Sequence, residues 1–161
     1  MKNTFIILIA LCFAFAAPAQ ETIEKNYALN GISQVEFDMD LSDQIIIKTW
    51  DKQEVYIKAI VDINDNTDND KYSLTSRESG DRLVIKAEIE DLKSIGKSRS
   101  THVRGVVVRD DEYCVQVEID YEIFLPENLA IELETISGDI EAFGLTGPVK
   151  IKTISGLVDL S

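Results

Sequence analysis

The chain has 161 residues and carries 29 acidic against 16 basic side chains, which gives a formal net charge of −13 at pH 7. A length of this order suits one domain. Because neutralisation of phosphates dominates binding to nucleic acids, this charge excludes a nucleic-acid binder held by a generally basic surface. It also disfavours adsorption to anionic membranes. Hydrophobic residues make up 45% of the chain, which excludes a disordered acidic tail.

Residues 1–19 have the features of a secretory signal peptide. Lys2 precedes an apolar run from Phe5 to Ala17, and Ala17-Pro18-Ala19 forms a small-x-small cleavage site. The run is shorter than the about 20 residues that a membrane-spanning helix needs. We therefore predict cleavage after Ala19, export to the periplasm or cell surface, and no transmembrane segment in the mature protein. An uncleaved anchor or a buried strand is the alternative.

The two cysteines, Cys12 and Cys114, are expected to form no disulfide. Lipidation of Cys12 is not expected, because it requires a small residue just before the cysteine and Leu11 stands there. Cleavage removes Cys12 and also Lys2, which changes the net charge from −13 to −14. Cys114 then has no partner in the chain, and we expect it to pack as a small hydrophobic side chain rather than to react.

Beyond the signal peptide, apolar and polar residues alternate with a period of two, which is typical of strands with one buried face. The alternation predicts strands over 35–41, 55–63, 83–89 and 113–123. Turn-forming residues lie between them at 50–52, 78–81 and 125–128. No stretch of the mature chain has the pattern of a helix of three turns, so the predicted fold class is all-β.

Residues 62–70 alternate Asp and Asn and so resemble a calcium-binding loop. The spacing of an EF-hand fails, because Thr67 stands where that loop needs Gly and Ser73 where it needs Glu. We therefore favour a solvated hairpin connection between strands over 54–63 and 71–77. Weak calcium binding stays an open alternative, and we predict no metal site.

Residues 93–109 contain five basic side chains and no acidic one. The segment predicts a long loop followed by a short strand. It would bind an anionic polymer or an acidic partner, or it would only offset the negative field of the protein, and we favour the second interpretation. The basic residues of this candidate partner-binding loop are Lys93, Lys97, Arg99, Arg104 and Arg109.

No catalytic constellation can be assembled from the sequence. His102 is the sole histidine, and neither Gly-x-Ser-x-Gly nor His-x-x-x-His occurs. Gly96-Lys97-Ser98 lacks the earlier glycine of a phosphate-binding loop. Carboxylates are so plentiful that no pair can be singled out for glycoside cleavage. We predict no catalytic residue and no cofactor, and a protein that is not an enzyme.

An internal repeat lies near the C-terminus. Thr135-Ile136-Ser137-Gly138 recurs as Thr153-Ile154-Ser155-Gly156, and the flanking apolar positions recur at the same offset. A fixed period with preserved inward positions indicates a solenoid, so 131–160 predicts two coils of equal period with Ser-Gly corners. Glu132 and Glu134 would then lie beside Lys150 and Lys152 in a parallel stack. Two ordinary hairpins, as in a β-sandwich, are the alternative.

Two coils are too few for a stable solenoid, so the N-terminal strands are expected to complete or cap the core. The last coil, 149–160, would leave unpaired backbone groups at its edge. Either the N-terminal strands cover this edge, or the chain self-associates through it. Because the repeat stops at Ser161, we also expect the C-terminus to be truncated or capped by another element.

Residues 133–156, with the sequence LETISGDIEAFGLTGPVKIKTISG, resemble the "putative adhesin" family of exported bacterial β-strand-repeat proteins. Members of that family carry repeated T-x-S-G-x-(I/V) rungs. Residues 44–59, QIIIKTWDKQEVYIKA, resemble its N-terminal strand pair, and residues 62–112 match least. The resemblance implies a right-handed, parallel β-helix-like fold at the C-terminal end with N-terminal strands packed on it, a location at the cell envelope, and no known catalytic residues.

Taken together, these features favour an exported, non-enzymatic envelope protein of a bacterium. It would act as an adhesin-like binding or scaffold module whose partner is a protein or a glycan of the envelope. A regulatory or sensory ectodomain in an envelope-stress system is the first alternative. A carbohydrate-active β-helix enzyme is the least favoured one.

Overall fold

The computed structural model describes residues 20–90, 106–110 and 113–161. The predicted signal peptide lies outside the described residues. Apart from one short 3-10 turn, η1 (Asn69–Lys71), the regular elements of these described ranges are all strands, so the predicted all-β class is confirmed. No helix in the described part of the chain is long and apolar enough to cross a membrane.

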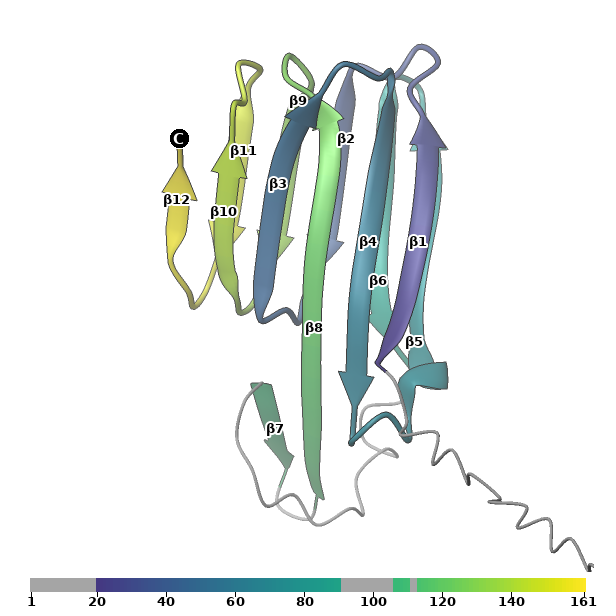
Figure 1. The fold of residues 1–161 in the computed structure, drawn as a ribbon, viewed down its shortest axis with the longest axis vertical. Coiled ribbons are helices and arrows are strands. Elements are labelled where there is room, and N and C mark those ends of the chain that lie inside the picture. The colour runs from purple at the N-terminus through teal and green to yellow at the C-terminus, as the bar shows by residue number, and fades with distance from the viewer. Residues whose placement is uncertain (1–19, 91–105, 111–112) are drawn as a thin grey trace, which may run out of the picture.

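The strands form two sheets that face each other, and neither sheet is closed (Figure 1). Sheet A has the order β1 (Glu21–Ala28), β4 (Glu54–Ile63), β8 (Tyr113–Pro126), β3 (Gln44–Trp50), β10 (Asp139–Phe143), β12 (Val158–Leu160), and β7 (Val106–Asp110) also pairs with β8. Sheet B has the order β11 (Val149–Thr153), β9 (Ala130–Thr135), β2 (Gln34–Met39), β6 (Arg82–Ile89), β5 (Tyr72–Ser79).

The core fills the space between the two sheets, because alternate residues of both sheets point inward. In β4 every second residue from Val55 to Ile63 is fully buried. Sheet B contributes Val35, Phe37 and Met39 of β2 in the same way. One continuous cluster of buried apolar side chains therefore joins the sheets.

The strands of the repeat stack in parallel at the offset that the repeated motif predicts. Val149 lies opposite Ile131 in sheet B, and Val158 lies opposite Ile140 in sheet A. On the outer face of sheet B, the Lys150 ammonium lies 2.6 Å from the Glu132 carboxylate, and Lys152 pairs with Glu134. The repeated residues therefore form two stacked strand–corner–strand units.

A third unit of the same kind, residues 34–50, continues this stack. β2 pairs in parallel with β9, and β3 pairs in parallel with β10. Its corner, Asp40-Leu41-Ser42-Asp43, does not carry the Thr-Ile-Ser-Gly motif, so the sequence repeat did not disclose it. The N-terminal strands therefore extend the repeat on its β9–β10 side.

One expectation about the surrounding strands is wrong, and one of the two alternatives for the last coil is excluded. Residues 64–71 do not connect a hairpin, because β4 lies in sheet A and β5 in sheet B, and the segment crosses from one sheet to the other. The N-terminal strands do not cover the last coil either, because β11 and β12 lie at the ends of their sheets. In the described structure Val158 is 43% and Leu160 55% exposed.

Candidate functional site

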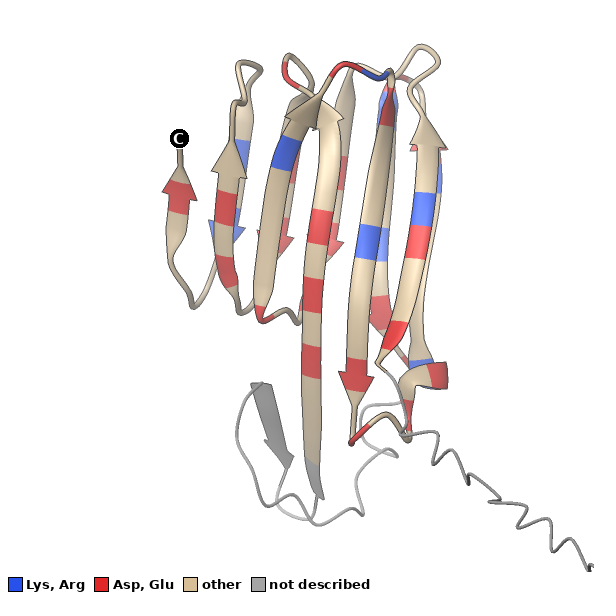
Figure 2. Cartoon of the chain, viewed as in Figure 1, with Lys and Arg blue, Asp and Glu red and all other residues tan. Residues whose placement is uncertain are grey.

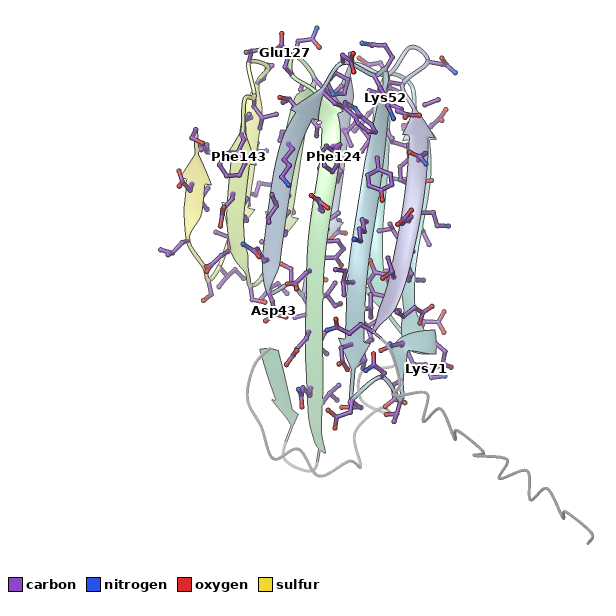
Figure 3. The ribbon with its side chains drawn as sticks, viewed as in Figure 1. Asp43, Lys52, Lys71, Phe124, Glu127 and Phe143 are labelled. Atoms are coloured by element: carbon purple, nitrogen blue, oxygen red, sulfur yellow. The ribbon has the colours of Figure 1, made fainter. Side chains whose placement is uncertain are left out.

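Aromatic side chains gather on the outer face of sheet A, at outward positions of its alternating strands. Tyr56 of β4 lies opposite Phe124 of β8, which in turn lies opposite Lys48 of β3. Trp50 ends β3 beside them, where its ring contacts the other two. Figure 3 shows Phe124 on this face of the sheet. We call Trp50, Tyr56 and Phe124 the aromatic platform.

The three rings of the platform hold one another in place. The ring centroids of Trp50 and Phe124 are 5.5 Å apart, those of Tyr56 and Phe124 are 6.0 Å apart, and those of Trp50 and Tyr56 are 6.2 Å apart. These separations and the tilted ring planes are those of favourable aromatic pairs. The Trp50 Nε1–H donates a hydrogen bond of 2.9 Å to the Glu54 carbonyl oxygen, which fixes the indole. The rings remain partly exposed.

Polar side chains border the platform. The Lys52 ammonium lies 4.3 Å from the centroid of the Trp50 ring, within the range of a cation–π contact. The Lys48 ammonium lies 5.6 Å from the Phe124 centroid and 2.7 Å from the Glu122 carboxylate. The rings, Lys52 and their polar neighbours line an open hollow of about 440 Å³. The site therefore has an apolar floor and a rim with hydrogen-bond donors and acceptors.

The charged groups around the platform carry a small excess of negative charge, because Lys48 and Lys52 are each paired with a carboxylate and Glu24 lies near Tyr56. Figure 2 shows acidic positions recurring along β8, next to the platform. Desolvation, and then the neighbouring Glu24 carboxylate, raises the pKa of the Tyr56 phenol above its ordinary value. The Tyr56 hydroxyl is protonated at neutral pH and is hydrogen-bonded to the Glu24 carboxylate. The platform suits a neutral ligand better than an anionic one.

The corner residues that the repeat singled out lie away from the platform. Gly138 has φ +115° and Gly156 has φ +121°, values that favour glycine. Ser42 occupies the corresponding corner of the next coil, where its hydroxyl donates to the Ser137 carbonyl oxygen at 2.6 Å. The Ser155 N–H donates to the Ile136 carbonyl oxygen at 3.0 Å. These corners precede β3, β10 and β12, whereas the platform lies where β3 ends, so their role is to stack the coils.

The Asp/Asn run also has a structural explanation. Asn64, Asp65 and Asn66 have φ between 52° and 63°, a conformation that Asn and Asp tolerate better than most residues. The Asn69 side-chain oxygen accepts the Ile63 N–H at 2.7 Å, and the Asn64 side-chain oxygen accepts the Gln116 N–H at 3.0 Å. The run therefore satisfies backbone groups where the chain crosses between sheets. The residues that the structure describes contain no group of three or more acidic, His or Cys side chains placed to hold a metal.

The predicted basic loop cannot be compared with the platform. Lys93, Lys97, Arg99 and Arg104 lie outside the described residues. Arg109 belongs to β7, of which only the backbone is described. The basic-loop hypothesis therefore stays a prediction.

Sequence reasoning missed the platform, although a signal for it was present. Tyr56 stands at a solvent-facing position of the alternation, between the inward positions Val55 and Ile57. Phe124 stands at a similar position near the end of β8. A large aromatic residue at such a position is a candidate for binding, but only the register of β4, β8 and β3 brings these rings together.

Comparison with known proteins shows a shared fold and no sequence family. No family model matches the chain, and no curated protein matches it. A solved structure of a "putative cell adhesion protein" from Clostridium sporogenes has a TM-score of 0.57 at 14% identity, over 88% of this chain and 60% of that chain. A "putative adhesin" from Parabacteroides merdae has a TM-score of 0.39 at 11% identity, over 87% of this chain and 52% of that chain. The Clostridium structure and this chain share a fold, and this chain spans less than two-thirds of that protein.

Proposed function

We propose that this protein is an exported, non-enzymatic, adhesin-like module that binds a neutral glycan of the cell envelope on the aromatic platform. The observation that carries the proposal is the gathering of Trp50, Tyr56 and Phe124 on the solvent-facing side of a sheet. Aromatic rings at solvent-facing positions do not pack into the core between the sheets. Trp and Tyr are enriched among the residues that contribute most to binding energies.

The chemistry of the platform matches that of a sugar. One side of a sugar ring presents C–H groups that pack against an aromatic face, and its edge presents hydroxyl groups. Lys52 and Asn26 at the rim supply donors, and the Glu54 side chain supplies an acceptor. The ammonium groups of Lys48 and Lys52 are already paired with the carboxylates of Glu122 and Glu54. A carboxylated or sulfated glycan would have to compete with these carboxylates, which is why a neutral glycan is favoured.

The fold supports the same function. We interpret the parallel stacking of residues 34–50, 130–143 and 149–160 as a β-helix-like solenoid with stacked corners. Of the platform strands, β3 belongs to this stack, and β8 and then β4 pair beside it. This pairing fixes the register of the three rings, and rigidity of this kind reduces the cost of binding. The name of the Clostridium structure, a "putative cell adhesion protein", and the predicted signal peptide support a role outside the cytoplasm.

The test is a binding panel with residues 20–161. Neutral and anionic envelope glycans are screened, and affinities for the hits are measured for the wild type, Trp50→Ala and Tyr56→Ala. We expect both variants to lose at least about tenfold in affinity, as for a binding hot spot. Phe143→Ala is the matched control, because Phe143 is exposed on the same sheet and does not line the hollow.

Two results would contradict the proposal. One is a panel in which no neutral glycan binds the wild-type protein. The other is an equal loss of affinity in Phe143→Ala and in the platform variants, with all of them folded by circular dichroism.

A further inference from the structure

A second hollow, distinct from the platform, opens between the two sheets. It measures about 500 Å³, a size usual for small-molecule sites. Its walls are mostly apolar and come from both sheets and from two corners: Ala87 and Ile89 of β6, Ile119 of β8, Leu41 and Ile136. It therefore reaches from the surface into the edge of the core.

The hollow lies where the stack lacks a tight corner. Residues 40–43 link β2 to β3, and residues 136–138 link β9 to β10, so each of these coils is closed by a short turn between the sheets. The next strands in the stack are β6 and β8. Here β7 lies between them in the chain, and it pairs with the part of β8 that extends beyond the neighbouring β3. The hollow therefore lies beside β6 and β8, a pair of neighbouring strands that no short corner joins.

Two buried tyrosines, Tyr72 and Tyr121, also line the hollow. Their hydroxyl oxygens are 3.2 Å apart, and the residues are 6% and 2% exposed. Each hydroxyl carries one hydrogen, and the hydrogen bond between the two tyrosines uses one of these two hydrogens. The other hydrogen finds no acceptor among the contacts of the described residues, and buried donors rarely stay without one. Burial raises the pKa of Tyr72 to about 12 and also raises that of Tyr121, so both hydroxyls stay protonated.

The charged groups at the mouth disfavour an anion. Lys86 is the basic residue of the lining, and its ammonium lies 3.1 Å from the Glu88 carboxylate and 3.6 Å from that of Asp38. Asp40 lines the mouth as well. Among the described residues of the lining, the carboxylates of Asp40 and Glu88 outnumber the Lys86 ammonium, which disfavours an anionic head group.

We propose that this hollow binds an uncharged, mostly apolar carbonyl compound of the size of a medium-chain acyl ester or ketone. The apolar walls take the hydrocarbon part, and the spare tyrosine hydrogen is donated to the carbonyl oxygen. This site is independent of the glycan-binding platform, which lies on the outer face of sheet A.

The test uses residues 20–161 and three probes of equal chain length: 2-octanone, octane and octanoate. Affinities are measured by ligand-observed NMR. We expect 2-octanone to bind, and octanoate to bind most weakly. Tyr72→Phe combined with Tyr121→Phe should lower the ratio of ketone affinity to octane affinity by about three- to tenfold, because the hydrogen bond to the carbonyl is lost while the apolar walls are unchanged.

Two further variants locate the binding. Ile136→Trp should block the mouth and abolish binding of all probes, and it leaves the core untouched because Ile136 is 44% exposed. Tyr56→Ala on the platform should leave ketone binding unchanged. Absence of ketone binding, an unchanged ratio of ketone to octane affinity in the double tyrosine variant, or unchanged binding in Ile136→Trp would each overturn the proposal. None of these results bears on glycan binding, which the platform variants report separately.

Discussion

Replacing Gly138 with alanine is expected to cost about 2–6 kcal/mol of unfolding free energy. Gly138 has φ +115°, and its Cβ would lie 2.6 Å from the Ser42 carbonyl oxygen. The backbone conformation alone costs an L-residue of order 1–3 kcal/mol. Relieving the overlap would push apart two stacked corners, and overpacking of this kind costs about 1–3 kcal/mol more. The free energy of unfolding of a typical domain is about 5–15 kcal/mol, so the substitution would remove a large part of the stability of the protein.

The matched control for this substitution is Gly80→Ala. Gly80 also has positive φ, at +65°, but no atom lies within 4 Å of a Cβ placed there. Its replacement should cost only the left-handed conformation, about 1–2 kcal/mol. Urea denaturation of residues 20–161 measures the stability of both variants. If the m-value is unchanged, a difference between the urea midpoints reports a difference in stability. Equal midpoints for Gly138→Ala and Gly80→Ala would refute the stacked-corner account.

Three more outcomes are expected for residues 20–161. The free energy of unfolding should fall as the pH rises above about 10. The pKa of Tyr72 is raised to about 12 in the folded protein, so the unfolded chain loses the phenol proton first, and this costs about 2–3 kcal/mol by about pH 12. Tyr72→Phe should flatten part of this fall in urea denaturation; the same pH profile in the variant and the wild type would contradict the assignment to Tyr72. A Cβ at Gly156 would overlap the Gly138 carbonyl oxygen. Gly156→Ala should still shift the urea midpoint less than Gly138→Ala, because β11 and β12 end their sheets and only one neighbouring coil would be displaced; a larger shift would contradict this. Sedimentation velocity should show self-association through the exposed strand β12 when salt is raised to about 0.1 M, because salt screens the repulsion between the negatively charged chains. Val158→Lys should prevent this association. A wild-type monomer at every salt concentration would contradict association through β12.

Local patterns in the sequence predicted the faces of the strands correctly. The alternation from Val55 to Ile63 places every second side chain at full burial, because period-two patterning needs no knowledge of the partner strand. The fixed offset of the repeat likewise predicted which residues of β9 and β11 lie opposite each other. Both signals lie within short stretches of chain, and that is why the sequence alone discloses them.

Features that depend on distant pairing could not be predicted in the same way. The unit 34–50 stacks on β9 and β10 although these strands follow it only much later in the chain, and its corner at Ser42 carries no repeat motif. Residues 64–71 resembled a hairpin loop because nothing local shows that β4 and β5 join different sheets. The platform depends on the same long-range register, since Trp50 and Phe124 meet only through the pairing of β3 with β8.

Fluorescence of Trp50 tests the binding function most directly, because Trp50 is the sole tryptophan of the chain and belongs to the platform. Titration of residues 20–161 with a neutral envelope glycan should give a saturable change in its emission, with the midpoint at the dissociation constant measured independently. The Tyr56→Ala variant keeps Trp50 and should require at least about tenfold more glycan. Binding measured by another method without any change in Trp50 emission would show that the glycan sits elsewhere and would contradict the assignment of the platform.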